Sequence, residues 1–205
     1  HAVPVRGTLM GNRGGCMHTP GQRLTGRPWV NTRWIACSLD YKGQHREVMQ
    51  PGRYTELFFL DEATAFSAGH RPCMLCRRSG ARRFLAAWAE GNGASDALRS
   101  VDALDSVLHA ERIDPASRGQ RATRTSLRGL PDGAMVTVDD DPALPRLLWD
   151  GVLWPWSFAG YGDPLSPSRG LAGIEVTLLT PPSVVEAFRA GYRPAVHPSC
   201  AAAAQ

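Results

Sequence analysis

The apolar residues of the N-terminal third occur in short runs between glycines and prolines, a pattern typical of strands joined by loops. Residues 34–39 (WIACSL) and 56–60 (ELFFL) are two such runs, and we expect both to form buried strands. Asp61 then suits the N-cap of a helix over residues 62–68, and Gly69 stands where a left-handed residue commonly ends a helix. The pattern therefore predicts two strands followed by a short capped helix.

Helical spacing dominates the middle of the chain. Residues 77–90 place large apolar side chains on one side, and residues 95–112 repeat apolar side chains at helical intervals behind Ser95 as N-cap. The stretch 114–129 instead carries four arginines among small polar residues, which predicts a basic linker. We therefore expect two helices and then a boundary between domains.

The last third of the chain returns to strand patterns. The turn sequence Asp150-Gly151 predicts a β-hairpin, and Thr180 is the expected N-cap of a helix that Gly191 ends. The tail 201–205 carries no structural signal and is expected to be disordered. Strands are predicted over residues 134–138, 146–149, 152–154 and 174–179.

These elements predict an α+β protein built from a small metal-binding module, a helical segment and a β-rich C-terminal part. We place the module at residues 1–92, the helix and basic linker at 93–129, and a small α+β domain at 130–205. An apolar content of 43% over 205 residues is enough to bury an ordinary globular core.

Composition adds two expectations. No signal-peptide pattern and no apolar run long enough to span a membrane occurs, and an odd number of cysteines argues against a disulfide framework. We therefore expect a reducing, cytoplasmic location. The net charge of +4 comes almost entirely from arginine, since Lys42 is the only lysine. Arginine suits phosphate groups and favours a polyanionic partner, although a GC-rich genome produces the same bias.

The strongest chemical signal is Cys73-Met74-Leu75-Cys76, which follows Arg-Pro and precedes a basic helix. Two thiolates at this spacing can face one ion while backbone N–H groups of the turn stabilise their charge. A redox pair or two buried cysteines are the alternatives. Zinc is the expected ion because it is the usual metal of thiolate-rich sites.

The residues around these cysteines resemble a known family. Phe58-Phe59, Ala63, Ala68-Gly69-His70-Arg71-Pro72-Cys73 and Cys76 are similar to the second half of the Ada-type metal-binding domain, in which a helix ends in Ala-Gly-aromatic-Arg-Pro-Cys-x-x-Cys. The resemblance covers about 25 of 205 residues. It implies a zinc-bound domain that binds DNA, and in the repair protein of that family one zinc thiolate accepts a methyl group from a damaged phosphate.

The resemblance also implies two earlier ligands, spaced as Cys-x-x-x-Cys or His-x-x-x-Cys. No such pair precedes Phe58 in this chain, which puts the methyl-acceptor chemistry in doubt. Cys37 ends a predicted strand and is the expected third ligand, and His18 is preferred to Cys16 as the fourth.

The leading functional hypothesis is a zinc-binding, DNA-associated protein with a role in DNA repair or processing. Five arginines beside the cysteines would contact phosphates, unless zinc only stabilises the fold and they form a solvated face. They are Arg71, Arg77, Arg78, Arg82 and Arg83.

A zinc-dependent hydrolase or deaminase acting on a nucleobase or related small molecule is the alternative hypothesis. His45-Arg46-Glu47, followed by Pro72-Cys73 and Cys76, matches the zinc deaminase signature, with Glu47 as the proton shuttle of a zinc-bound water. That fold needs a helix after Glu47, which Pro51-Gly52 opposes. The sequence leaves open whether the metal is structural or catalytic.

One internal similarity completes the pattern. Phe66-Ser-Ala-Gly-His-Arg-Pro-Cys73 and Phe188-Arg-Ala-Gly-Tyr-Arg-Pro-Ala195 share a helix end, an Ala-Gly stop and Arg-Pro. We expect the same helix-ending chemistry at both positions rather than a second metal site.

Overall fold

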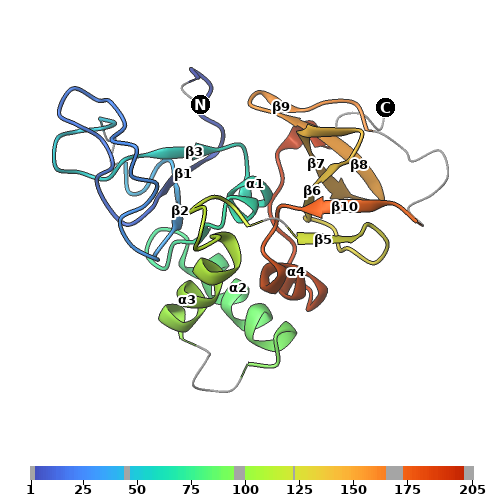
Figure 1. Cartoon of the computed structure of the whole chain (residues 1–205). Helices are drawn as coiled ribbons and strands as arrows, with labels where there is room; N and C mark the ends of the chain where they lie inside the picture. The colour runs from blue at the N-terminus through green and yellow to red at the C-terminus, as the bar shows by residue number, and fades with distance from the viewer. Residues whose placement is uncertain (1–2, 44–46, 95–99, 122, 165–172, 201–205) are drawn as a thin grey trace.

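The protein folds into two β-sheets and four α-helices in a computed structural model that describes residues 3–43, 47–94, 100–121, 123–164 and 173–200 (Figure 1). The predicted α+β class is confirmed. The elements are β1 (Leu9–Asn12), β2 (Ile35–Ser38), β3 (Leu57–Phe59), α1 (Glu62–Ser67), β4 (Arg71–Pro72), α2 (Arg78–Gly91), α3 (Val101–Arg112), β5 (Thr123–Ser126), β6 (Met135–Val138), β7 (Asp141–Trp149), β8 (Val152–Ser157), β9 (Gly160–Tyr161), β10 (Glu175–Leu178) and α4 (Pro182–Arg189), followed by a 3₁₀ turn at Pro198–Cys200.

The smaller sheet has the strand order β3-β1-β2-β4, in which β1 is antiparallel to both neighbours and β4 runs parallel to β2. Strands β2 and β3 confirm the two predicted strands. Strand β1 falls where no strand is predicted, and it lies second in the sheet. The glycine at position 11 weakens the strand pattern of the sequence, but the structure requires it, because a Cβ there would overlap the ring of Phe59. Glycine at this position allows the ring to pack directly on the strand.

The larger sheet has the order β5-β10-β6-β7-β8-β9. The predicted hairpin is present between β7 and β8, where Asp150 and Gly151 both have positive φ, as a two-residue turn of this kind requires. The stretch 114–129, predicted as a basic linker, also contains a strand, because β5 lies inside it and pairs with β10 at the sheet edge.

Local capping explains where α1 and α3 begin. Asp61 accepts a hydrogen bond from the backbone N–H of Thr64 at 2.8 Å, as predicted for α1. Ser100 caps α3 through the N–H of Ala103 at 3.1 Å, whereas the predicted cap, Ser95, lies outside the described residues. The tail 201–205 lies outside them too.

The predicted start of α4 is wrong by one position. Pro181 is the N-cap and Pro182 begins the helix, while the hydroxyl of Thr180 accepts the N–H of Met135 at 2.9 Å. Thr180 therefore ties the start of α4 to the larger sheet instead of capping the helix.

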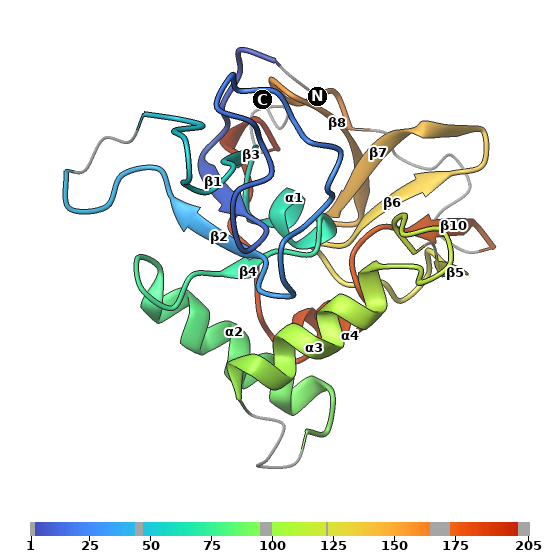
Figure 2. The ribbon, with the colours of Figure 1, turned by 60° about the vertical axis from the view of Figure 1, so that its left-hand side comes forward.

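Hydrophobic cores join the segments that the sequence divides into three units. Helices α2, α3 and α4 lie together on one side of both sheets (Figures 1 and 2), and Phe66, Trp88, Leu104 and Phe188 belong to one buried cluster. Leu60 shares a second cluster with apolar residues of the larger sheet. The predicted units thus pack against one another through common cores.

Two buried carboxylates at the start of α1 connect it to the C-terminal part. Asp61 accepts hydrogen bonds from the hydroxyl of Tyr161 at 2.8 Å and the N–H of His197 at 2.9 Å. Glu62 accepts the hydroxyl of Tyr192 at 2.8 Å. These bonds fix α1, and with it the chain entering β4. Among the described residues, no helix is long and apolar enough to cross a bilayer.

Candidate metal centre

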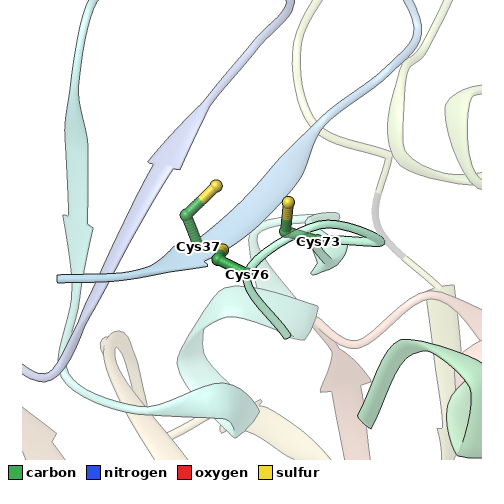
Figure 3. Close-up of side chains that lie close together, drawn as sticks. All are labelled: Cys37, Cys73 and Cys76. Atoms are coloured by element: carbon green, nitrogen blue, oxygen red, sulfur yellow. The ribbon is translucent and has the colours of Figure 1, made fainter. Parts of the chain in front are cut away.

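Three cysteines from two chain segments meet at the end of the smaller sheet (Figure 3). Cys37 belongs to β2, and Cys73 and Cys76 lie in the turn between β4 and α2. The parallel register pairs Ala36 with Pro72, and the residue that follows each of them is a cysteine. The backbone N–H of Cys73 donates to the carbonyl of Ala36 at 2.9 Å and fixes this alignment.

The geometry of the three thiols suits one metal ion. Their Sγ atoms all lie within 4.8 Å of one another, and all three cysteines are free and half-buried. Two sulfurs bound to one tetrahedral zinc at about 2.3 Å would be about 3.8 Å apart. The thiols therefore lie close to the separation of metal ligands, and Cys37, Cys73 and Cys76 together could hold a metal ion.

Two of the sulfurs accept hydrogen bonds from backbone N–H groups. Cys73 accepts the N–H of Leu75 at 3.3 Å, and Cys76 accepts the N–H of Ser38 at 3.4 Å. The hydrogen bond from Cys37 lowers the pKa of Cys73 to about 5, and the same bond together with burial raises the pKa of Cys37. In the metal-free site the thiolate therefore resides mainly on Cys73.

His18, the predicted fourth ligand, is not brought to the thiols. The ring is buried, with Nδ1 2.7 Å from the Thr55 hydroxyl and Nε2 3.2 Å from the Gln50 carbonyl, so protein groups occupy both nitrogens. Cys16 accompanies it, with Sγ 3.7 Å from Nδ1 of His18. In the described part of the chain, no other histidine, cysteine or carboxylate joins the three thiols.

Two hollows flank the thiol cluster and leave it accessible. One, of about 270 Å³, is lined by Cys37, Cys73 and Cys76 together with apolar residues and Arg6. The other, of about 320 Å³, is lined by Cys37 and Cys73 with polar groups that include Glu56. A ligand from solution can therefore approach a metal held by the thiols.

Two of the five predicted phosphate-binding arginines are held in largely buried ion pairs instead. Arg71 donates two hydrogen bonds to Asp105, both 2.8 Å long, and Arg77 contacts Glu62 at 2.5 Å. Arg71 thus joins β4 to α3, and Arg77 joins the turn that carries Cys73 and Cys76 to α1. Both are corrected to structural residues, because a guanidinium that is already paired with a buried carboxylate is not available to DNA.

The other three arginines do face solvent. Arg78, Arg82 and Arg83 are exposed on α2, which begins two residues after Cys76. Arg78 and Arg82 are one helical turn apart and form a positive strip. The structure therefore keeps a smaller basic surface beside the metal site.

The residues of the deaminase signature do not adopt the secondary structure that the signature requires. Glu47 is exposed and accepts the side-chain N–H of Gln50 at 2.8 Å, and the described residues from 47 to the start of α1 contain no helix. His45 lies outside the described residues. β4 does lead into Cys73, but the helix that would carry the proton shuttle is missing from that described stretch.

Comparison with other proteins adds no assignment. No family model, curated protein sequence or solved structure matches this chain.

Proposed function

We propose that this protein binds zinc through the thiolates of Cys37, Cys73 and Cys76. The observation that supports the proposal is the approach of the three Sγ atoms to within 4.8 Å of one another. Soft thiolates favour zinc among the common divalent ions. Three protein ligands leave a fourth tetrahedral position, which water or a ligand from either hollow would take.

We further propose that the zinc-bound protein associates with DNA through the exposed side of α2. Arg78, Arg82 and Arg83 project from the helix that follows the metal-binding turn, so a metal that orders this turn also orders the start of the basic helix. Their contacts would go to phosphates and would be independent of sequence. The resemblance to the Ada-type domain points in the same direction.

A zinc-dependent hydrolase is the second candidate function. The observation that favours it is the hollow that contains Glu56 beside Cys37 and Cys73, because a metal with three protein ligands and an open position can activate water. Glu56 accepts the N–H of Met49 at 2.8 Å, which leaves acceptor capacity on its carboxylate.

The zinc proposal predicts the metal content of cysteine variants. Protein purified under reducing conditions should carry about one zinc per chain, and Cys73→Ser should lose nearly all of it, because three ligands cannot be reduced to two without a large loss of affinity. Elemental analysis measures the content. Cys16→Ser is the matched control, since this half-buried cysteine lies outside the cluster, and it should retain the metal. Unchanged zinc in Cys73→Ser would refute the assignment.

The DNA proposal predicts a change in salt dependence. Replacing Arg78 and Arg82 with Gln should weaken duplex binding and reduce the slope of log K against log salt by about 1 to 2, at about 0.9 for each phosphate that the protein no longer neutralises. Fluorescence anisotropy at several salt concentrations measures both. The control replaces Arg53 and Arg128, two exposed arginines outside α2, and removes the same charge. Equal weakening by both double variants would mean that overall charge, and not α2, holds DNA.

A further inference from the structure

Another cavity, separate from the two hollows beside the thiols, lies between the β1–β2 connection and the loop that follows α3. Its volume is about 200 Å³, and Arg13, Trp29, Trp34, Arg112 and Arg118 line it. None of its lining residues, all of them in the described part of the chain, carries a carboxylate. Three positive side chains thus share one small space.

The arginines stack on tryptophan rings around this cavity. The guanidinium carbons of Arg13 and Arg112 lie 3.9 and 3.7 Å from the ring centroid of Trp34. That of Arg118 lies 5.1 Å from the ring centroid of Trp29. Stacking holds each guanidinium plane in place, and the N–H groups lie along the edge of that plane rather than on the face that meets the ring.

Among the described residues, no carboxylate forms an ion pair with Arg13 or Arg112. Arg112 is only 4% exposed and donates to the carbonyls of Gly69 at 2.6 Å and Thr32 at 2.7 Å. Its guanidinium also lies 3.2 Å from Nδ1 of His109, while its Nε has no partner. Arg13 donates to one carbonyl at 3.3 Å, and its Nε is likewise buried without a partner. Burial lowers the pKa of Arg112 to about 9, so the site disfavours the charge that it contains.

Other arginines in the protein interior show the contrast. Arg71 meets Asp105, Arg77 meets Glu62 and Arg146 meets Asp141. The charge of Asp105 does reach Arg112, but both of its oxygens are bound to Arg71. A buried cation without a paired counter-ion is costly, and a fold normally supplies one. At the cavity the compensating negative charge would have to come from a ligand.

The loop at the edge of the cavity is held in an uncommon conformation. Arg118 has φ +56°, in the left-handed region that non-glycine residues seldom adopt, and its N–H donates to the carbonyl of Asp114 at 2.8 Å. In this conformation its guanidinium lies over Trp29, at the cavity that Arg13 and Arg112 also line.

We propose that this cavity binds a phosphate group, either as inorganic phosphate or as the end of a small phosphate monoester. Phosphate oxygens accept the paired N–H groups that guanidinium edges present, and three arginines can balance a dianion. Since one water occupies about 30 Å³, a cavity of this size holds a phosphate with room for a small substituent. The tryptophan faces offer that substituent an apolar wall. The site does not depend on the metal centre.

Isothermal titration of the whole protein with inorganic phosphate, and separately with phenyl phosphate as a small aromatic monoester, tests the proposal. We expect saturable one-to-one binding of at least one ligand, and Arg118→Gln should weaken it about tenfold by removing one charged donor. Tighter binding of the monoester would mean that the tryptophan rings contact its substituent. Tighter binding of inorganic phosphate would mean that the site takes only the free ion.

The control is Arg128→Gln, which removes an exposed arginine away from the cavity and should leave affinity unchanged. Arg118 is exposed on a loop, so its variant is expected to fold, and circular dichroism checks this. Arg13→Gln gives a second measurement inside the cavity. The proposal fails if neither ligand binds at millimolar concentration, or if affinity is the same in Arg118→Gln, Arg13→Gln and the unmodified protein.

Discussion

At the scale of single residues, the three thiols of the candidate metal centre share their chemistry but not their surroundings. Cys73 receives hydrogen bonds from the Cys37 thiol and from the backbone N–H of Leu75, whereas Cys37 donates and is more deeply buried. These contacts lower the pKa of Cys73 to about 5 and raise that of Cys37. Two chemically identical thiols therefore differ through position alone: Cys73 carries the thiolate and accepts a hydrogen bond, and Cys37 stays protonated and donates it.

This asymmetry predicts the pH dependence of alkylation in metal-free protein. A lowered pKa means that the Cys73 thiolate is populated above pH 5, so its reaction with iodoacetamide should rise through a midpoint near pH 5. Cys37, whose pKa is raised, should react only at much higher pH than Cys73. Peptide mapping by mass spectrometry measures each site. Cys37→Ser should move the Cys73 midpoint upward, because it weakens the largest cause of the shift. A Cys73 midpoint at about pH 8 or above in the unmodified protein would contradict this description.

At the scale of elements, the repeated Ala-Gly sequence ends two helices in the same way. After α1, the N–H groups of Gly69 and His70 donate to the carbonyls of Phe66 and Ala65, at 2.8 and 2.9 Å. After α4, the N–H groups of Gly191 and of the tyrosine that follows it donate to helix carbonyls in the same pattern, at 3.0 and 3.1 Å. Both glycines have positive φ. The similarity is thus explained by helix termination.

The two glycines differ in their surroundings, which predicts unequal effects of alanine. Both substitutions force a left-handed alanine, at a cost of about 1 kcal/mol each. At Gly69 the new Cβ would also overlap Cδ of Arg112, whereas at Gly191 no atom lies within 4 Å. Crowding at Gly69 should add about 1 to 3 kcal/mol, so Gly69→Ala should lose clearly more unfolding free energy in urea. Equal losses would mean that Arg112 is not held against this turn.

Elements can be predicted from sequence where local chemistry determines them. Asp61 and Gly69 mark both ends of α1, and Asp150-Gly151 marks the hairpin, because caps and turns depend on neighbouring residues. Strand β1 escapes prediction because it has four residues and a glycine inside it. Strand β5 escapes it because its residues are polar, and only pairing with β10 makes them a strand.

At the scale of the whole molecule, long-range partners determine which predicted site residues meet. Cys37 reaches Cys73 because β2 and β4 pair, an outcome consistent with its place in a predicted strand. His18 is retained by Thr55 and Gln50, and Arg71 by Asp105, residues more than 30 positions away. Spacing along the chain carries no signal for such partners. Sequence therefore identifies the thiols but not the surroundings of the histidine and of the buried arginines.

X-ray absorption at the zinc edge of the purified, metal-loaded protein tests the proposed zinc centre most directly. We expect three sulfur neighbours at about 2.3 Å and one nitrogen or oxygen neighbour at about 2.0 to 2.2 Å. The sulfur count should fall to two in any Cys73→Ser protein that still holds metal, and Cys16→Ser should keep three. A first shell of nitrogen and oxygen alone, or of four sulfurs, would contradict a zinc centre built on Cys37, Cys73 and Cys76.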